Sequence, residues 1–392
     1  MKILIIRTIA IEEDLSKLTY NNQGLGLATE LSKLGHECAL VYYAKRGNGR
    51  NEEIISDGEK IKVYHIEGYN LIWNAIYENK LYELCNQYDV IQVSECDQIC
   101  SWQVYRRFPD KTVIYHGPYA SKFTWKYNLR SRAFDFLFSN RSNFKMARVI
   151  SKSLLAENYL RGKGFKNITT LGVGLNERLF SDDIDIPENV KAIIDNKFDN
   201  IYLLYIGAIS KRKNLLFILK ILKDLVYKKH HINCRLIIVG GRAYKENSYF
   251  DKCFEYIKRE SLQKFVMYIP KLEQKYIQHL YKVSDMFLLA TQYDIFGMVY
   301  LEALYFGVPV ITTNCGGASL LIKDGENGFI RDFDKNGWIE AIDSLVNDPQ
   351  KMQQIKDAGS SLIRRNFLWN KLAPKFLAIY EEILDAKKYN FS

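Results

Sequence analysis

Short apolar segments alternate with longer amphipathic segments along the first half of the chain. The stretches Leu25–Leu34 and Leu154–Arg161 repeat apolar residues at helical spacing. The predicted strands are Lys2–Arg7, Cys38–Tyr43, Ile61–Ile66, Val90–Val93, Thr112–Tyr115 and Ala147–Ile150. Because these strands are apolar along their length, they indicate a parallel sheet that helices cover on both faces.

The same alternation restarts after residue 200. Its predicted strands are Tyr202–Ile206, Arg235–Val239, Phe265–Ile269, Met286–Ala290 and Val308–Thr312. Its predicted helices are Leu215–Val226, Tyr249–Glu260, Leu272–Val283, Met298–Phe306, Trp338–Val346, Lys351–Arg364 and a last one, Lys371–Ala386. The pattern therefore predicts two doubly wound α/β domains with a cleft between them, where ligands lie beyond the carboxyl ends of the strands.

The acidic, polar stretch between the two halves predicts an interdomain linker. We therefore expect a first domain at 1–181, a linker at 182–200, a second domain at 201–370 and a terminal helical segment at 371–392.

Composition narrows the class of protein. The 392 residues are 47% hydrophobic, which excludes a disordered chain, and the net charge of +10 suggests an anionic partner. No apolar run approaches the roughly 20 residues that span a bilayer, and the start is not typical of a signal peptide. The seven cysteines include no CxxC pair, so we expect reduced core thiols in a cytoplasmic protein and no metal site.

The segment 293–317 holds the most informative candidate residues. Asp294 and Glu302 lie eight positions apart and flank Phe296 and Gly297. Gly297 can open a helix whose first amides form an anion site, and Glu302 can accept hydrogen bonds from sugar hydroxyls. An N-capping aspartate beside a solvated glutamate is the simpler interpretation.

Two further segments follow predicted strands. Lys211, Arg212 and Lys213 crowd the turn after the strand that ends at Gly207, which suits a diphosphate, although a solvated charge run is commoner. His116 directly follows the strand Thr112–Tyr115 and should face the cleft, although a lone histidine is more often structural.

Together these segments resemble the retaining glycosyltransferases of family 4, which have the GT-B fold. The segment Asp294–Glu302 is similar to the family's E-x7-E signature and precedes the block VPVITTNCGG at 308–317. GHEC at 35–38 and LGVGLNERLF at 171–180 are similar to two further family motifs. The resemblance implies that the last helix crosses back onto the first domain.

The resemblance also implies roles for single residues. Lys213 matches the lysine that binds the donor diphosphate, Glu302 the acid that holds the nucleotide ribose, and Asp294 the acid beside the transferred sugar. His116 matches a histidine near the sugar's 6-position, and Gly24 to Gly26 match a donor-contacting loop of the first domain. The predicted catalytic residues are His116, Lys213, Asp294 and Glu302. The predicted donor-binding residues are Gly24, Gly26, Gly207, Arg212, Lys213, Phe296, Gly297, Met298, Val299 and Glu302.

The sequence departs from the family pattern at several positions. The family's arginine after the glycine is Ala208, and our hypothesis is that Arg212 supplies the lost phosphate contact. The first signature acid is shortened to Asp294, and the acid expected after the glycine pair is replaced by Leu320. The DxD string at 183–185 lies in the predicted linker, where we expect solvated charge rather than a metal site.

Most of the surplus charge falls in residues 101–148, which hold ten basic residues, two acids and twelve aromatics. Such a mixture suits an anionic membrane surface, or nucleic acid by stacking, or a helix with aromatic core contacts and a basic outer face. We favour a docking surface for a lipid-linked acceptor. The residues of the predicted patch are Arg106, Arg107, Lys122, Trp125, Lys126, Arg130 and Arg132.

The resemblance thus predicts a metal-independent retaining hexosyltransferase of lipopolysaccharide or capsule synthesis. Its donor is a UDP- or GDP-linked sugar, its acceptor is a saccharide or a lipid-linked saccharide, and no other cofactor and no nucleic acid are expected. We expect a cytoplasmic protein with peripheral contact to the inner face of the plasma membrane. A sugar-nucleotide epimerase of related fold and a non-catalytic sugar-nucleotide-binding scaffold subunit are the alternatives.

Overall fold

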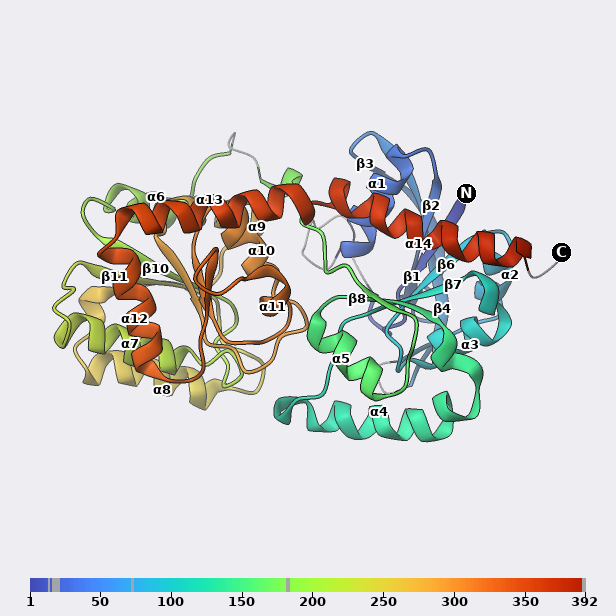
Figure 1. Cartoon of the computed structure of the whole chain (residues 1–392), viewed down its shortest axis with the longest axis horizontal. Coiled ribbons are helices and arrows are strands. Elements are labelled where there is room, and N and C mark those ends of the chain that lie inside the picture. The colour runs from blue at the N-terminus through green and yellow to red at the C-terminus, as the bar shows by residue number, and fades with distance from the viewer. Residues whose placement is uncertain (13–14, 16–21, 72–73, 181–183, 390–392) are drawn as a thin grey trace. The chain divides into compact units, whose positions relative to one another are not determined.

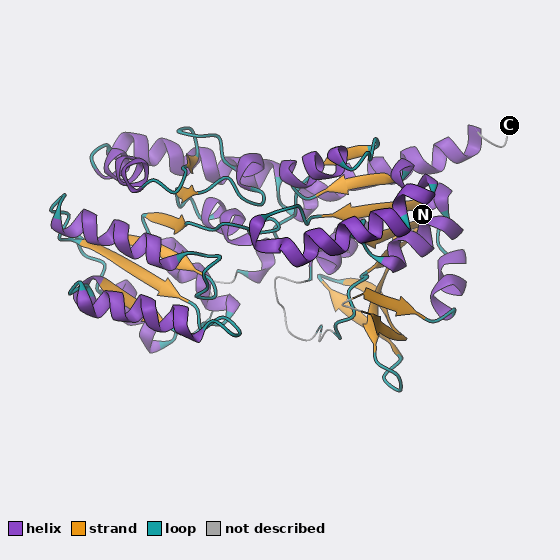
Figure 2. Cartoon of the chain, turned by 90° about the horizontal axis from the view of Figure 1, so that it is seen from below, coloured by secondary structure: helices purple, strands orange, loops and turns teal. Residues whose placement is uncertain are grey.

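The computed structural model describes residues 1–12, 15, 22–71, 74–180 and 184–389, and divides the chain into two units. The first unit comprises Met1–Asn176 with Phe367–Ser392, and the second comprises Glu177–Asn366. In both units the strands lie between helices, as Figures 1 and 2 show.

The first unit is built on a sheet in the order β3-β4-β2-β1-β6-β7-β8-β9, and β5 pairs with β4. Strands β3 and β5 run antiparallel to β4, whereas the other pairs are parallel. The strands are β1 (Lys2–Ile6), β2 (Glu37–Ala44), β3 (Arg50–Ser56), β4 (Glu59–Leu71), β5 (Asn74–Tyr77), β6 (Val90–Ser94), β7 (Thr112–His116), β8 (Arg148–Ser151) and β9 (Ile168–Thr170). The helices are α1 (Gln23–Lys33), α2 (Lys80–Asn86), α3 (Ile99–Arg107), α4 (Trp125–Leu137), α5 (Leu154–Gly162) and α14 (Trp369–Tyr389).

The second unit holds a parallel sheet in the order β12-β11-β10-β13-β14-β15. Its strands are β10 (Ile201–Ile206), β11 (Cys234–Val239), β12 (Val266–Ile269), β13 (Met286–Leu289), β14 (Val310–Thr312) and β15 (Gly328–Ile330). Its helices are α6 (Glu188–Asp195), α7 (Leu215–Tyr227), α8 (Asn247–Arg259), α9 (Gln274–Val283), α10 (Met298–Tyr305), α11 (Ala318–Leu321), α12 (Lys335–Val346) and α13 (Pro349–Asn366).

The last helix belongs to the first unit, as the resemblance implied. Trp369, Phe376 and Tyr380 of α14 are buried, and the Tyr380 hydroxyl donates a 2.7 Å hydrogen bond to the side chain of Gln92 on β6. Because Gly26 on α1 has no side chain, the Trp369 ring can lie against that helix; a Cβ there would come within 2.5 Å of the indole.

The expected linker is corrected by the structure. Residues 188–195 form α6, whose Val190 and Ile193 are buried, and the Tyr202 hydroxyl donates a 2.9 Å hydrogen bond to the carbonyl of Ile193. The acidic residues Glu188 and Asp195 lie exposed at the two ends of this helix, which belongs to the second unit. Residues 181–183, and with them Asp183 of the DxD string, lie outside the described residues.

Candidate active site

The second unit has a topological switch point between β10 and β13. From β10 the chain adds β11 and β12 on one side and then returns to place β13 on the other side. Ligands of such sheets bind beyond the carboxyl ends of the strands at this point. The predicted residues Gly207, Lys213 and Asp294 all lie in the segments that follow these two strands.

Glycines bring the backbone and Lys213 together at the end of β10. Gly207 has a φ of +147°, and a Cβ there would come within 2.3 Å of the Lys213 ammonium nitrogen. Gly240, at the end of β11, would place a Cβ 2.1 Å from the Gly207 carbonyl oxygen. Side chains at either position would therefore push the lysine or the neighbouring strand away.

The two neighbouring lysines of the turn differ in their surroundings. Lys213 is partly buried, and burial lowers the pKa of its ammonium group, an effect that the Asp294 carboxylate only partly opposes. Lys211 is exposed, and its amide donates a 2.5 Å hydrogen bond to the Glu246 carboxylate. A desolvated cation gains more from a bound anion than an exposed one, so Lys213 is better suited than Lys211 to bind an anion.

Arg212 connects the turn after β10 to the segment after β13 by hydrogen bonds. Its carbonyl accepts a 2.8 Å hydrogen bond from the Gln292 amide, and its guanidinium donates to the Tyr293 carbonyl. The same guanidinium lies 3.6 Å from the Asp294 carboxylate. The structure therefore brings Arg212, Lys213 and Asp294 together, and their roles at a donor site stay predictions.

Two glycines allow the segment before α10 to adopt its backbone conformation and its close contacts. Gly297 has a φ of +86° and directly precedes Met298 and Val299, the first residues of α10, so their amides lie at the positive end of the helix. A Cβ on Gly297 would come within 2.4 Å of the Tyr300 ring. Gly316, with a φ of +59°, approaches the Asp294 carbonyl so closely that a Cβ would lie 3.0 Å from it.

Glu302 is buried on α10 with 0% of its surface exposed, so the interpretation as a solvated glutamate is wrong. Its Oε1 accepts a 2.9 Å hydrogen bond from the Gln274 amide, and its Oε2 accepts one of 2.9 Å from the Tyr281 hydroxyl. Both donors come from α9. Glu302 thus links α9 to α10 through two hydrogen bonds. A bound ribose would have to share the Glu302 carboxylate oxygens with Gln274 and Tyr281.

In the first unit, the structure places the predicted residues differently from expectation. Gly24 and Gly26 lie within helix α1 and not in a loop, and Gly26 packs against Trp369. The predicted donor-contacting loop is therefore corrected to a helix. His116 ends β7 and is only 1% exposed, with its Nδ1 3.1 Å from the amide nitrogen of Cys96.

The predicted basic patch divides between two helices. Arg106 and Arg107 lie at the end of α3, over the rings of Trp102 and Tyr82. Seven of the exposed residues at and before α4 form what we call the α4 face. It consists of Lys122, Phe123, Trp125, Lys126, Leu129, Arg132 and Phe136.

Burial divides the aromatic and apolar residues of segment 101–148 into a buried group and an exposed group. Phe134 and Phe144 are buried core residues, whereas Trp125, Leu129 and Phe136 are 62%, 64% and 65% exposed. Arg130 is partly buried and lies 3.6 Å from the Asp97 carboxylate. The α4 face is thus an apolar stripe beside three exposed cations. Within the described residues, no helix has the length and apolar character needed to cross a membrane.

Residues 188–361 match the family described as glycosyl transferases group 1. Spore coat protein SA of Bacillus subtilis is 28% identical over 184 residues, 46% of this chain and 48% of that protein. The capsular polysaccharide biosynthesis glycosyltransferase CapM of Staphylococcus aureus is 25% identical over 245 residues, 60% of each chain. The chain spans about half the length or less of the first curated relatives that it matches.

Solved structures share the fold over nearly the whole chain. Sucrose-phosphate synthase of Thermosynechococcus elongatus has a TM-score of 0.73 at 16% identity and covers 98% of this chain and 100% of its own. Anabaena HepE in complex with UDP has a TM-score of 0.72 at 16% identity, covering 97% and 100%. The predicted resemblance to glycosyltransferases is confirmed at the level of group 1, and the predicted GT-B fold is confirmed by the shared fold. The narrower resemblance to family 4 stays a prediction.

Proposed function

We propose that the chain is a glycosyltransferase that moves a hexose from a UDP- or GDP-linked sugar to a saccharide acceptor in surface polysaccharide synthesis. One observation carries the proposal. In the unit that matches group 1 glycosyltransferases, the switch point gathers Arg212, a partly buried Lys213, Asp294 and the glycine-opened start of α10. The name of CapM, a capsular polysaccharide relative, supports the same class of product.

The charges at this switch point fit the leaving group of such a reaction. Breaking the sugar–phosphate bond develops negative charge on the diphosphate. Lys213, Arg212 and the amides at the start of α10 stabilise that charge, so the proposed reaction needs no metal ion. One such donor contributes about 3–4 kcal/mol to transition-state stabilisation.

The proposed stereochemical course is retention. As the bond to the donor breaks, the departing phosphate oxygen accepts the proton of the acceptor hydroxyl. The acceptor oxygen then bonds to the anomeric carbon on the face that the phosphate leaves. No side-chain nucleophile takes part, and Asp294 lies beside the transferred sugar.

We further propose that the acceptor is lipid-linked and that the α4 face contacts an anionic membrane. Trp125, Leu129 and Phe136 recur at helical spacing on one side of α4, and Lys122, Lys126 and Arg132 flank them. Each such cation near an anionic leaflet contributes about 1 kcal/mol, and the apolar side chains add the free energy of their transfer from water.

Cosedimentation with vesicles tests the membrane contact. We expect binding to phosphatidylglycerol vesicles and much weaker binding to phosphatidylcholine vesicles. Replacing Lys122, Lys126 and Arg132 by Gln should abolish the difference, whereas Gln at the exposed cations Lys252, Lys258 and Lys264 of the second unit should not. Equal binding of the two triple variants would refute the α4 face as the docking surface.

A screen of nucleotide sugars by thermal stabilisation tests the enzyme itself. A cognate donor at a hundredfold excess over its Kd adds about 2.7 kcal/mol to stability. Donor hydrolysis by the purified protein should be lost in Lys213→Ala and Glu302→Ala and kept in Lys211→Ala, which changes an exposed cation of the same turn. Conversion of the donor to an epimer would establish the epimerase instead, and binding without turnover would establish the scaffold.

A further inference from the structure

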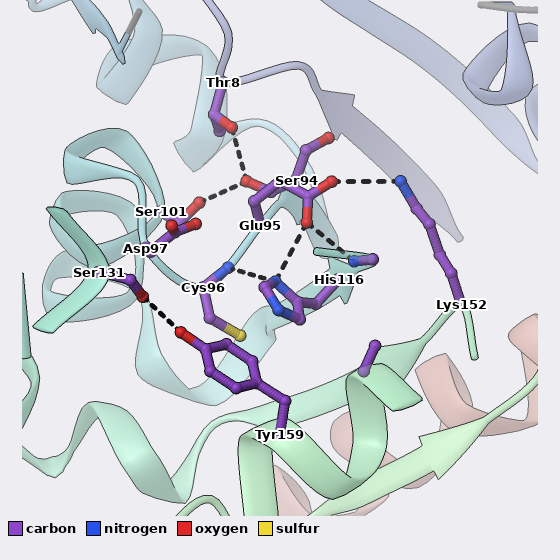
Figure 3. Close-up of polar contacts among 12 residues, drawn as sticks. Thr8, Ser94, Glu95, Cys96, Asp97, Ser101, His116, Ser131, Lys152 and Tyr159 are labelled. Carbon is purple, nitrogen blue, oxygen red and sulfur yellow. Dashed lines mark hydrogen bonds and ion pairs between the residues drawn. The ribbon is translucent and has the colours of Figure 1, made fainter. Parts of the chain in front are cut away.

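Three neighbouring parallel strands of the first unit end in charged or titratable residues at one edge of the sheet. Glu95 directly follows β6, His116 ends β7 and Lys152 directly follows β8. The chain leaves β1 for β2 and returns to place β6 on the other side of β1, so Glu95 lies at the switch point of this sheet. Figure 3 shows the three side chains converging.

Glu95 is a buried carboxylate with a partner on each oxygen. Its Oε1 lies 3.2 Å from the Lys152 ammonium, and its Oε2 lies 3.1 Å from His116 Nδ1 and accepts a 2.9 Å hydrogen bond from the Gly117 amide. Burial alone would raise the pKa of Glu95, but the Lys152 charge and the contacts with His116 and Gly117 lower it to about 2. The side chain is therefore ionised at neutral pH.

The backbone of Glu95 is also unusual, since its φ of +64° lies in the left-handed region that favours glycine. Such a conformation costs about 1–3 kcal/mol and tends to occur at functional sites. The neighbouring Ser94 carbonyl is fixed by hydrogen bonds from the Thr8 and Ser101 hydroxyls, at 2.5 Å and 2.8 Å (Figure 3). The segment is thus held in a strained arrangement by its surroundings.

Two groups compete for Nδ1 of His116. The Cys96 amide can only donate, and it meets Nδ1 at 3.1 Å, whereas Glu95 can only accept. A proton on Nδ1 satisfies Glu95 and leaves the amide without its acceptor; a proton on Nε2 does the reverse. Charge-assisted hydrogen bonds are about twice as strong as neutral ones, so the carboxylate contact outweighs the amide contact.

The other ring nitrogen lacks a partner. Nε2 of His116 is buried and has no hydrogen-bond partner within the described part of the chain, while the ring lies stacked on Tyr159 with 6.4 Å between centroids. The Tyr159 hydroxyl is itself fixed by a 2.9 Å hydrogen bond to Ser131 (Figure 3). A buried nitrogen of this kind calls for a polar partner that the described part of the chain does not supply, and a ligand hydroxyl is one such partner.

We propose that Glu95 is a positioning residue that fixes His116 with its proton on Nδ1, so that Nε2 accepts a hydrogen bond from a hydroxyl of the bound sugar. Lys152 neutralises the carboxylate without contacting the ring. The identity of the ligand rests on the proposed function, whereas the position of the proton does not. Glu95 acts only through His116, because its own oxygens are engaged by protein groups.

Nitrogen-15 spectra of the histidine-labelled full chain test the proton position, with His116→Asn to assign the signal. We expect the Nδ1–H tautomer in the wild type and a shift to the Nε2–H tautomer in Glu95→Gln, because the neutral side chain no longer outweighs the Cys96 amide. The control is Glu157→Gln, whose carboxylate bonds Arg161 and Thr170, and it should leave the tautomer unchanged. An Nε2–H wild type would overturn the proposal, even if Glu95→Gln failed to fold.

The second readout uses the nucleotide sugar that stabilises the protein most. Binding should move the Nε2 signal of His116, and Glu95→Gln should lower kcat about 10–100-fold with a smaller change in KM. An unmoved Nε2 signal in the presence of demonstrated binding would overturn the sugar contact. If no nucleotide sugar binds, the proposed function fails, and the tautomer still decides the role of Glu95.

Discussion

Replacing Glu95 by Gln should make the stability of the protein less sensitive to acid. The pKa of this carboxylate falls from 4.5 to about 2 on folding, because the Lys152 charge and the contacts with His116 and Gly117 outweigh the opposing effect of burial. Since the folded-state pKa is depressed, the stabilisation is present above pH 4.5 and is lost as the pH falls toward 2. The difference corresponds to about 3 kcal/mol at neutral pH.

Urea unfolding of the wild type and Glu95→Gln at pH 6, 5, 4 and 3.5 measures this contribution. We expect the wild type to be more stable at pH 6 and its advantage to shrink by about 1.4 kcal/mol at pH 3.5, because the unfolded carboxylate takes up its proton over this range. The control is Glu326→Gln, an exposed glutamate paired with Lys323, whose difference from wild type should stay nearly constant. A Glu95→Gln difference that does not change with pH would refute the reasoning.

Three further substitutions separate donor binding from packing. Arg212→Ala should raise the Kd of the nucleotide sugar about tenfold in calorimetry, because charged hydrogen bonds are the stronger ones; an unchanged Kd would reject Arg212 as the substitute phosphate ligand. Gly297→Ala should abolish donor hydrolysis and lower the free energy of unfolding by about 1–3 kcal/mol. Gly297 has a φ of +86°, and the Cβ of the introduced alanine would meet the Tyr300 ring. Full activity of this variant would contradict the geometry. Gly26→Ala should destabilise the protein by about 1–3 kcal/mol and leave donor affinity unchanged, because the Cβ of the introduced alanine would meet Trp369. A loss of donor affinity at unchanged stability would instead show that Gly26 contacts the donor.

The strands that the sequence predicted are those with continuous apolar runs. The cores of β1, β2, β6 and β10 coincide with the predicted segments, because a buried parallel strand leaves an unbroken apolar signal. Strand β3 was missed because it is polar and lies at the edge of the sheet, so it has no continuous apolar run. Its pairing with β4 depends on the turn at residues 57–58. The helix of residues 188–195 was missed because its many charges concealed the two buried positions that fix it to the second unit.

The donor-site residues were easier to predict than the polar cluster around His116. Gly207, Lys213 and Asp294 carry their signal locally, as a glycine, a cation and an acid in the segments that follow two predicted strands. The prediction of a donor-contacting loop at Gly24 and Gly26 was wrong, because a glycine can serve either a ligand-binding loop or a close contact between helices. At Gly26 it serves a close contact with Trp369, which lies far away in the sequence.

Glu95 was missed because its significance comes from its neighbours in the sheet rather than from its neighbours in the sequence. In the sequence it is one acid in the polar stretch Ser94–Gln98, while His116 and Lys152 stand 21 and 57 positions further on. Parallel strands align their carboxyl ends, so the residues that end or directly follow β6, β7 and β8 must meet at one edge. The residues at the predicted strand ends, taken in sheet order, would have placed the histidine between the carboxylate and the lysine. What no pattern supplies is the left-handed backbone at Glu95, since tertiary contacts hold it against its local preference.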